Sequence, residues 1–124
     1  MILVRHGQSE FNVHYNRTRI DPGIEDPALT EVGCRQAAEA AEQLAREGVR
    51  RLLVSPYRRT LETAEVIAAA LDLPIEIEPL LRERMAFTCD IGSVRSLLAQ
   101  RWPHLRFDHV EEQWWPSEEE TEDR

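Results

Sequence analysis

The stretch that decides the fold is the first twelve residues, Met1-Ile-Leu-Val-Arg-His-Gly-Gln-Ser-Glu-Phe-Asn12. It opens with a continuous apolar run, the pattern of a strand that is buried on both faces of a sheet. The run leads directly into Arg5, His6 and Gly7. Open α/β sheets place their chemistry beyond the carboxyl ends of their strands. The imidazole of His6 is therefore the first candidate functional group.

The rest of the chain predicts alternating helices and strands. We expect helices over residues 30–47, 55–73 and 93–102, strands over 49–54 and 74–81, and a loop over 11–27, where Asp-Pro dipeptides signal turns. The first helix is expected to begin at the cap Thr30 and the second at Ser55-Pro56. This order favours an α/β fold, with a mainly parallel sheet and helices on both faces in three α/β/α layers.

Composition divides the 124 residues into a body, residues 1–107, and an acidic tail, residues 108–124. The net charge is -8, and the tail holds eight acidic residues against Arg124 alone. The nearly neutral body offers no basic field for nucleic acid. Without a long apolar run or room for a signal peptide before the first strand, we expect no membrane span and a cytoplasmic protein. The pair Trp114-Trp115 is expected to dock on the body.

The motif Arg5-His6-Gly7, with Asn12 in register behind it, resembles the signature that opens the histidine phosphatase (phosphoglycerate mutase-like) superfamily. This resemblance implies a phosphomonoester phosphatase in which His6 attacks phosphorus and forms a phosphohistidine intermediate. Arg5 would bind the phosphate, and Asn12 and Gln8 would add donors to the phosphate or substrate. The partner would be a small phosphorylated substrate.

A second segment, Ser55 to Ala64, resembles the strand-to-helix segment that carries the superfamily's other phosphate-binding arginine. Aligning the two ends of this segment, Ser55 and Thr63-Ala64, with the superfamily's segment assigns that role to Arg59. Arg58 is the neighbour most easily confused with it. Neither a metal nor another cofactor is predicted, because the acids and histidines show no ligand spacing and two arginines can do the work of a cation.

The stretch Leu80-Leu81-Arg82-Glu83 is similar to the one in which the superfamily places its proton donor, which points to Glu83. A carboxyl group held near phosphate has a raised pKa and can protonate a leaving alkoxide. A surface ion pair with Arg82 or Arg84 is the alternative interpretation of Glu83.

The superfamily's second histidine, in a His-Gly pair after a later strand, has no counterpart in this sequence. The resemblance covers about the first hundred residues, and the domain is expected to be truncated at its C-terminus. The chain is then an impaired phosphatase, a protein completed by a second copy or another partner, or a reduced form that uses His104 or His109. An uncovered strand edge favours self-association, so we expect a homodimer.

Two other functions remain open. Cys89 to Ser96 fits the Cys-x5-Arg-Ser pattern of cysteine-dependent phosphatases, although Asp90 would place a negative charge in that phosphate cradle. The second alternative is a non-catalytic phosphate-binding or scaffold domain, which retains Arg5 and Arg59 but catalyses no reaction.

Overall fold

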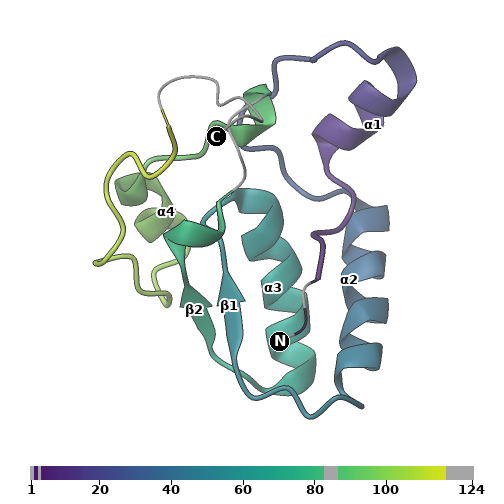
Figure 1. Ribbon diagram of the computed structural model, residues 1–124, viewed down its shortest axis with the longest axis vertical. Coiled ribbons are helices and arrows are strands. Elements are labelled where there is room, and N and C mark those ends of the chain that lie inside the picture. Colours follow the sequence, from purple (N-terminus) through teal and green to yellow (C-terminus); the bar gives the residue numbers. More distant parts are fainter. Residues whose placement is uncertain (1, 3, 83–86, 117–124) are drawn as a thin grey trace.

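The computed structural model describes residues 2, 4–82 and 87–116. It confirms the α/β class (Figure 1). In chain order the elements are α1 (Glu10–Thr18), α2 (Glu31–Leu44), β1 (Leu52–Val54), α3 (Arg58–Leu71), β2 (Ile75–Ile77), the 3-10 turns η1 (Pro79–Leu81) and η2 (Thr88–Asp90), and α4 (Arg95–Arg101). None of the helices in these described ranges is long and apolar enough to cross a bilayer.

The two strands are parallel, with Leu52 opposite Ile75 and Val54 opposite Ile77. A parallel pair needs a long crossover connection, and α3 supplies it. Val54 and Ile77 are buried, whereas Leu53, on the alternate side of the pleat, is 47% exposed. The sheet therefore turns one apolar side to the core.

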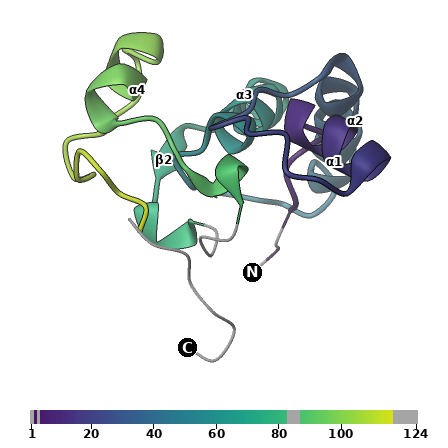
Figure 2. The ribbon, with the colours of Figure 1, turned by 90° about the horizontal axis from the view of Figure 1, so that it is seen from above.

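The core lies where the strands, α3, α4 and the last described segment meet. Helix α3 lies between the strands and α2, and α4 lies on the opposite flank (Figures 1 and 2). The buried cluster consists of Val54, Tyr57, Leu61, Ala64, Ile77, Leu98, Trp102, Phe107, Val110 and Trp114. Trp114 also donates from Nε1 to the carbonyl of Ser93 at 2.9 Å, which confirms that the tryptophan pair docks on the body.

The predicted loop over residues 11–27 is wrong in its first half, where the chain forms α1. Ser9 caps this helix by accepting from the N–H of Asn12, and the Asn12 side chain accepts from the N–H of Ser9 in return. These reciprocal bonds satisfy end groups that a helix cannot satisfy internally. The residues that favour turns interrupt regular structure only from Asp21 onward.

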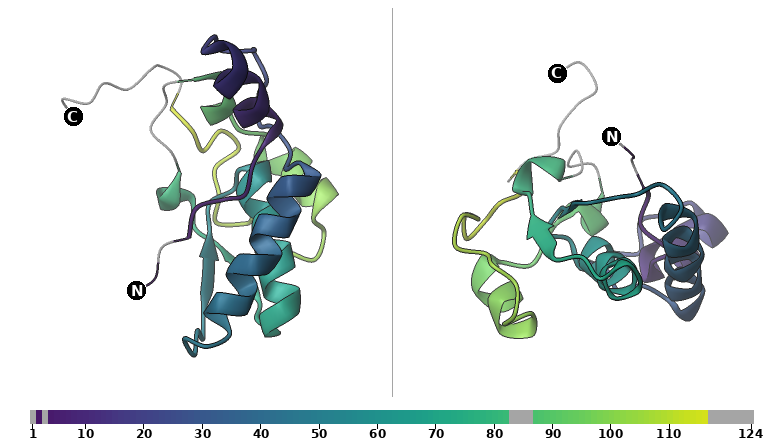
Figure 3. Two further views of the ribbon diagram at one scale, coloured as in Figure 1. Left: turned by 90° about the vertical axis from the view of Figure 1, so that its right-hand side faces the viewer. Right: turned by 90° about the horizontal axis from the view of Figure 1, so that it is seen from below.

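The predicted first strand is also not formed at its described residues. Ile2 and Val4 are 51% and 45% exposed and have no strand partner among the described residues, while residues 1 and 3 lie outside them. Residues 4–9 run alongside α2 before the chain enters α1 (Figure 3). An apolar run becomes a strand only where a neighbouring edge pairs with it.

The remaining predicted elements are present but shorter. Thr30 caps α2 as predicted, through its side chain and the N–H of Gly33. Helix α3 begins after Tyr57 instead of at Ser55-Pro56, because the Ser55 hydroxyl bonds Thr60 and does not cap.

Candidate active site

The position of His6 is set by two glycines that bring its segment against α2. A side-chain carbon at Gly7 would overlap the carbonyl of Gly33, and one at Gly33 would overlap the carbonyl of Gln8. Gly7 also donates its N–H to Thr63 Oγ1 of α3 at 3.1 Å, and Thr63 donates to the carbonyl of Arg59 at 2.7 Å. The backbone before and after His6 is thus tied to both helices.

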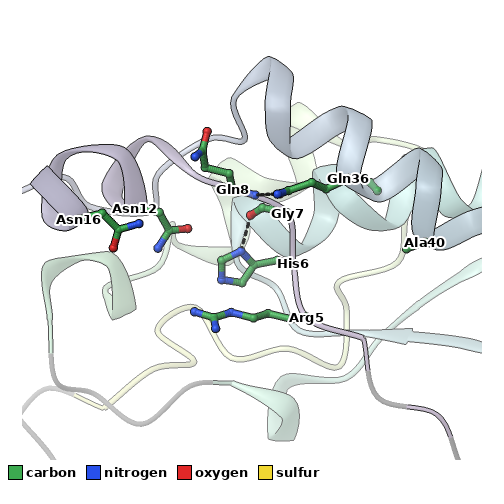
Figure 4. Close-up of a pocket in the computed structure, with 9 residues that line it drawn as sticks. Arg5, His6, Gly7, Gln8, Asn12, Asn16, Gln36 and Ala40 are labelled. Atoms are coloured by element: carbon green, nitrogen blue, oxygen red, sulfur yellow. Dashed lines mark hydrogen bonds between the residues drawn. The ribbon is translucent and has the colours of Figure 1, made fainter.

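The imidazole of His6 is half-buried, and its Nδ1 lies 2.7 Å from the carbonyl oxygen of Gly7 (Figure 4). A carbonyl only accepts hydrogen bonds, so this contact assigns the proton to Nδ1. Nε2 then carries the lone pair in the neutral ring, as a nucleophilic imidazole requires.

Arg5 and Asn12 lie on either side of His6 in Figure 4. Arg5 is exposed and forms no ion pair with a carboxylate among the described residues. The Oδ1 of Asn12 accepts from the N–H and hydroxyl of Ser9 at 3.0 and 3.1 Å. These bonds hold the side chain so that its amide nitrogen is the group that can donate to an anion.

Gln8 has a different orientation. Its Oε1 accepts from the hydroxyl of Thr30 at 2.8 Å, its backbone N–H donates to Gln36, and Figure 4 shows the side chain turned away from His6. This geometry ties Gln8 to the start of α2 and does not support the predicted role of its amide as a phosphate donor.

Arg59 lies in the first turn of α3 and is only 3% exposed. Its Nη1 donates to the carbonyl of Cys89 at 2.6 Å, and its Nη2 lies 3.5 Å from Oδ1 of Asp90. The guanidinium carbon stands 4.3 Å above the ring of Tyr57. Arg58 instead pairs with Glu62 at the surface. Of the two arginines, Arg59 is therefore the one held toward the interior.

Four of the residues predicted from the sequence line one cavity of about 710 Å³: Arg5, His6, Asn12 and Arg59. Its remaining lining residues are Ser9, Phe11, Tyr15, Asn16, Arg19, Phe87, Cys89 and Asp90. A second hollow of about 530 Å³, between α1 and α2, also includes Arg5, His6 and Asn12. An imidazole and two guanidinium groups, far apart in sequence, thus face the same space.

Other predicted residues lie elsewhere. Glu83 falls outside the described residues. His109 bonds the carbonyl of Ile77 through Nε2 at 2.6 Å, and neither it nor His104 lines the cavity. The structure therefore gives no support to the idea that either histidine replaces the superfamily's second one. No group of three metal-ligating side chains occurs in the described part of the chain.

Cys89 lines the cavity, but its chemistry is that of a thiol. Burial, and then the negative charge of Asp90, raise the pKa of Cys89 to about 12. A nucleophilic cysteine needs a lowered pKa to form the thiolate near neutral pH. The geometry thus disfavours the cysteine-dependent reaction.

Sequence reasoning missed the residues that hold Arg59. The carbonyl of Cys89 and the carboxylate of Asp90 approach it from about thirty positions away. Tyr57 lies beneath it, fully buried, and donates its hydroxyl to the carbonyl of Asp90 at 3.0 Å. The local sequence offers only a weak signal: Tyr57, the residue before α3, stands two positions from Arg59.

Fold and cavity together define an α/β protein in which a histidine shares one site with two arginines. The model of the histidine phosphatase superfamily (branch 1) matches residues 1–123, and the chain belongs to this superfamily. The members of the superfamily that it resembles are phosphatases and mutases.

Two curated relatives carry the name "Probable phosphoglycerate mutase GpmB". The one from Proteus mirabilis is 41% identical over 65% of this chain and 36% of its own length. The one from Yersinia enterocolitica is 32% identical over 92% of this chain and 46% of its own length. The chain thus spans less than half the length of these relatives.

Solved structures show the same fold. A mycobacterial glucosyl-3-phosphoglycerate phosphatase complexed with VO3 matches 64% of this chain and 36% of its own chain, with 33% identity and a TM-score of 0.53. A second structure, titled mycobacterial hydrolase 1, matches 80% of this chain and 45% of its own, with 28% identity and a TM-score of 0.57.

Proposed function

We propose that the protein hydrolyses small phosphomonoesters through a phosphohistidine intermediate on His6. The observation that carries this proposal is the shared cavity of His6, Arg5, Asn12 and Arg59. The names of the relatives, which are phosphatases and phosphoglycerate mutases, support phosphoryl chemistry at this position.

In the first step the lone pair on Nε2 of His6 attacks phosphorus, and the bond from phosphorus to the leaving alcohol oxygen breaks. The alkoxide takes a proton from an acid, the role that we propose for Glu83. In the second step water attacks the phosphohistidine, the P–N bond breaks, and the same carboxylate accepts the proton of the water. Splitting one hard displacement into two easier ones is what covalent catalysis contributes.

The cations compensate the negative charge on the phosphoryl oxygens. Phosphoryl transfer depends chiefly on positioning and on electrostatic stabilisation of these oxygens. Arg59 can present the N–H groups that are not directed at Cys89 and Asp90, while Arg5 can approach from the exposed side. The Asn12 amide would complete the cradle.

We expect this chain by itself to turn over phosphomonoesters slowly. The resemblance predicts a second histidine as a further donor to the phosphate, and this sequence has no His-Gly pair besides His6-Gly7. Losing one preorganised donor typically costs about two to three orders of magnitude in rate. We propose hydrolysis and not mutase activity, because hydrolysis needs fewer additional side chains in the site.

The test compares turnover of an aryl phosphate by the wild type, His6→Ala and Cys89→Ser, with phosphate affinity measured in parallel by titration calorimetry. Loss of turnover in His6→Ala alone, with phosphate binding in the wild type, is the expected result. Loss in Cys89→Ser alone would favour the cysteine-dependent reaction. Phosphate binding without turnover by the wild type would favour the non-catalytic phosphate-binding domain.

We also propose that the protein is a cytoplasmic homodimer. Leu53, Leu80 and Leu81 are 47%, 87% and 48% exposed at or after the strands, and a second copy could cover them. The free thiols of Cys34 and Cys89 fit a reducing compartment. A monomer mass by light scattering at micromolar concentration would contradict the dimer.

A further inference from the structure

Three aromatic side chains, Phe11, Tyr15 and Phe87, line part of the larger cavity. The rings of Phe11 and Tyr15 are stacked with centroids 5.6 Å apart, and Phe87 meets Tyr15 edge-on at 5.3 Å and Phe11 at 6.0 Å. All three rings line the same cavity as His6. A site that handled only a phosphate and a short polyhydroxy chain would have no use for such a surface.

These aromatic side chains come from two segments that are fixed independently. Phe11 is 4% exposed and lies one turn before Tyr15 on α1. Phe87 is 42% exposed, and its segment is anchored because its N–H donates to Asp90 at 3.0 Å. The N–H of Thr88 donates to Asp21 at 2.9 Å. The ring of Phe87 is therefore apolar surface held in place at the cavity rim.

A cation lies at the far end of α1. Arg19 lines the cavity, and its guanidinium carbon is 5.9 Å from the centre of the Tyr15 ring. It forms no ion pair with a carboxylate in the described ranges. Asn12, beside His6, is seven residues earlier on α1, and at 1.5 Å per residue the two positions are about 10 Å apart along the helix.

We propose that the natural substrate is a phosphomonoester whose alcohol carries a flat or apolar ring, with a second negative charge at the end remote from the phosphate. The ring would pack on Tyr15 and Phe87, which the buried Phe11 supports from behind, and the remote anion would pair with Arg19. This inference deepens the proposed function and rests on phosphate binding beside His6. It predicts that three-carbon phosphorylated acids bind more weakly than such a substrate, because they carry no ring to pack on Tyr15 and Phe87.

The experiment measures binding with phosphonates, which the enzyme cannot hydrolyse, by titration calorimetry. The probes are inorganic phosphate, methylphosphonate, biphenylphosphonate and 4′-carboxybiphenylphosphonate. We expect biphenylphosphonate to bind at least about tenfold more tightly than methylphosphonate, which corresponds to about 1.4 kcal/mol. The added carboxylate should improve binding by a further several-fold.

The variants separate the two contacts. Phe87→Ala should remove most of the preference for the biphenyl ring and leave methylphosphonate binding unchanged. Arg19→Gln should remove only the gain from the carboxylate. Arg17→Gln is the matched control, because Arg17 lies on the same helix, is also exposed and does not line the cavity. Thermal unfolding of each variant shows whether it is folded.

The outcomes are distinguishable. If phosphate and methylphosphonate bind but the ring adds nothing, or if Arg19→Gln behaves like Arg17→Gln, the substrate class is wrong and the proposed function stands. If neither phosphate nor methylphosphonate binds the wild type, the phosphate site itself is wrong and both proposals fail.

Discussion

Arg5 and Arg59 face the same cavity but are held in opposite ways. Arg59 is buried between Tyr57 and Asp90, and its orientation is fixed before any ligand arrives. Arg5 is exposed, and only the backbone of its segment is anchored, through Gly7. The difference indicates a site with one preorganised cation, on which folding also depends, and one cation that serves binding alone.

The largest expected effect comes from removing each arginine in turn. Arg59→Gln leaves the buried carboxylate of Asp90 without its cation, so the free energy of unfolding should fall by about 3 kcal/mol. Arg5→Gln should change it by less than about 0.5 kcal/mol. Both should weaken phosphate binding about tenfold or more, which is about 1.4 kcal/mol or more. Urea unfolding and phosphate titration measure the two effects.

The double variant Arg59→Gln/Asp90→Asn is the control for the buried charge. It should regain part of the lost stability without regaining phosphate affinity. Equal destabilisation by Arg5→Gln and Arg59→Gln would show that the two arginines are not held differently.

The backbone anchor on the Arg5 side can be broken with Gly33→Ala. The new methyl group would overlap the carbonyl of Gln8 and push the His6 segment off α2, at a cost of about 1–3 kcal/mol. Phosphate affinity should fall as well. Gly48→Ala is the control: Gly48 has a positive φ of 64° but open space around it, so this change should lower stability without changing phosphate affinity.

Two substitutions of Tyr57 separate the contribution of its ring from that of its hydroxyl group to the position of Arg59. Tyr57→Phe keeps the ring under the guanidinium and removes the hydrogen bond to Asp90, which should cost about 1 kcal/mol of stability and leave phosphate binding nearly unchanged. Tyr57→Leu also removes the ring and should weaken phosphate binding. If the two variants bind phosphate equally, the ring has no role in positioning Arg59.

The smallest effect is a change in pH dependence through Asp26, which accepts from the N–H of Arg58 next to Arg59. Burial raises the pKa of Asp26 above its ordinary value of 3.8, despite hydrogen bonds that oppose the shift. The folded state then binds this proton more tightly than the unfolded state. The free energy of unfolding contributed by Asp26 should therefore fall as pH rises through the interval between the two pKa values, and level off above it.

Asp26→Asn should remove that slope while Arg5→Gln keeps it. Urea unfolding at a series of pH values from 4 to 7 provides the measurement. A slope that is unchanged in Asp26→Asn would assign it to other carboxyl groups.

The elements that were predicted correctly carry strong local signals. Thr30 at a helix start, the apolar residues Leu52 to Val54, and the pair Ile75 and Ile77 each determine structure through their immediate neighbours. The sequence analysis predicts a loop where α1 forms, although Ser9 and Asn12 have the spacing of a capping box. The segment contains few apolar residues, and the turn residues that begin at Asp21 do not apply to the residues before them.

The inner face of α2 shows why spacing alone is insufficient. Helical spacing predicts an inner face of Cys34, Ala37, Ala38, Ala41, Leu44 and Ala45. In the structure Cys34, Ala38 and Ala45 are exposed, and the buried stripe is Gly33, Ala37, Ala41 and Leu44. A helix of small residues has nearly equal apolar faces, so tertiary contacts decide which face turns inward. Here the close approach of the His6 segment selects the face that carries Gly33.

The convergence of Arg5, His6 and Arg59 was predictable in outline, since both motifs could be located in the sequence. The hydrogen bond and ion pair that Arg59 forms with Cys89 and Asp90 were not predictable, because they join residues about thirty positions apart through a backbone carbonyl and a carboxylate. No residue pattern encodes a contact of that kind, which depends on how the segment before α4 packs on α3.

The carboxylate of Asp26 has one further consequence. It accepts from the backbone N–H of Arg58 at 2.8 Å and of Ser93 at 3.1 Å, 32 and 67 positions away. Neither amide belongs to a helical or strand ladder, and both would ordinarily exchange with deuterium quickly. Because each amide is held by a carboxylate from a distant stretch of the chain, its proton should exchange more slowly than those of loop amides that bond only to water.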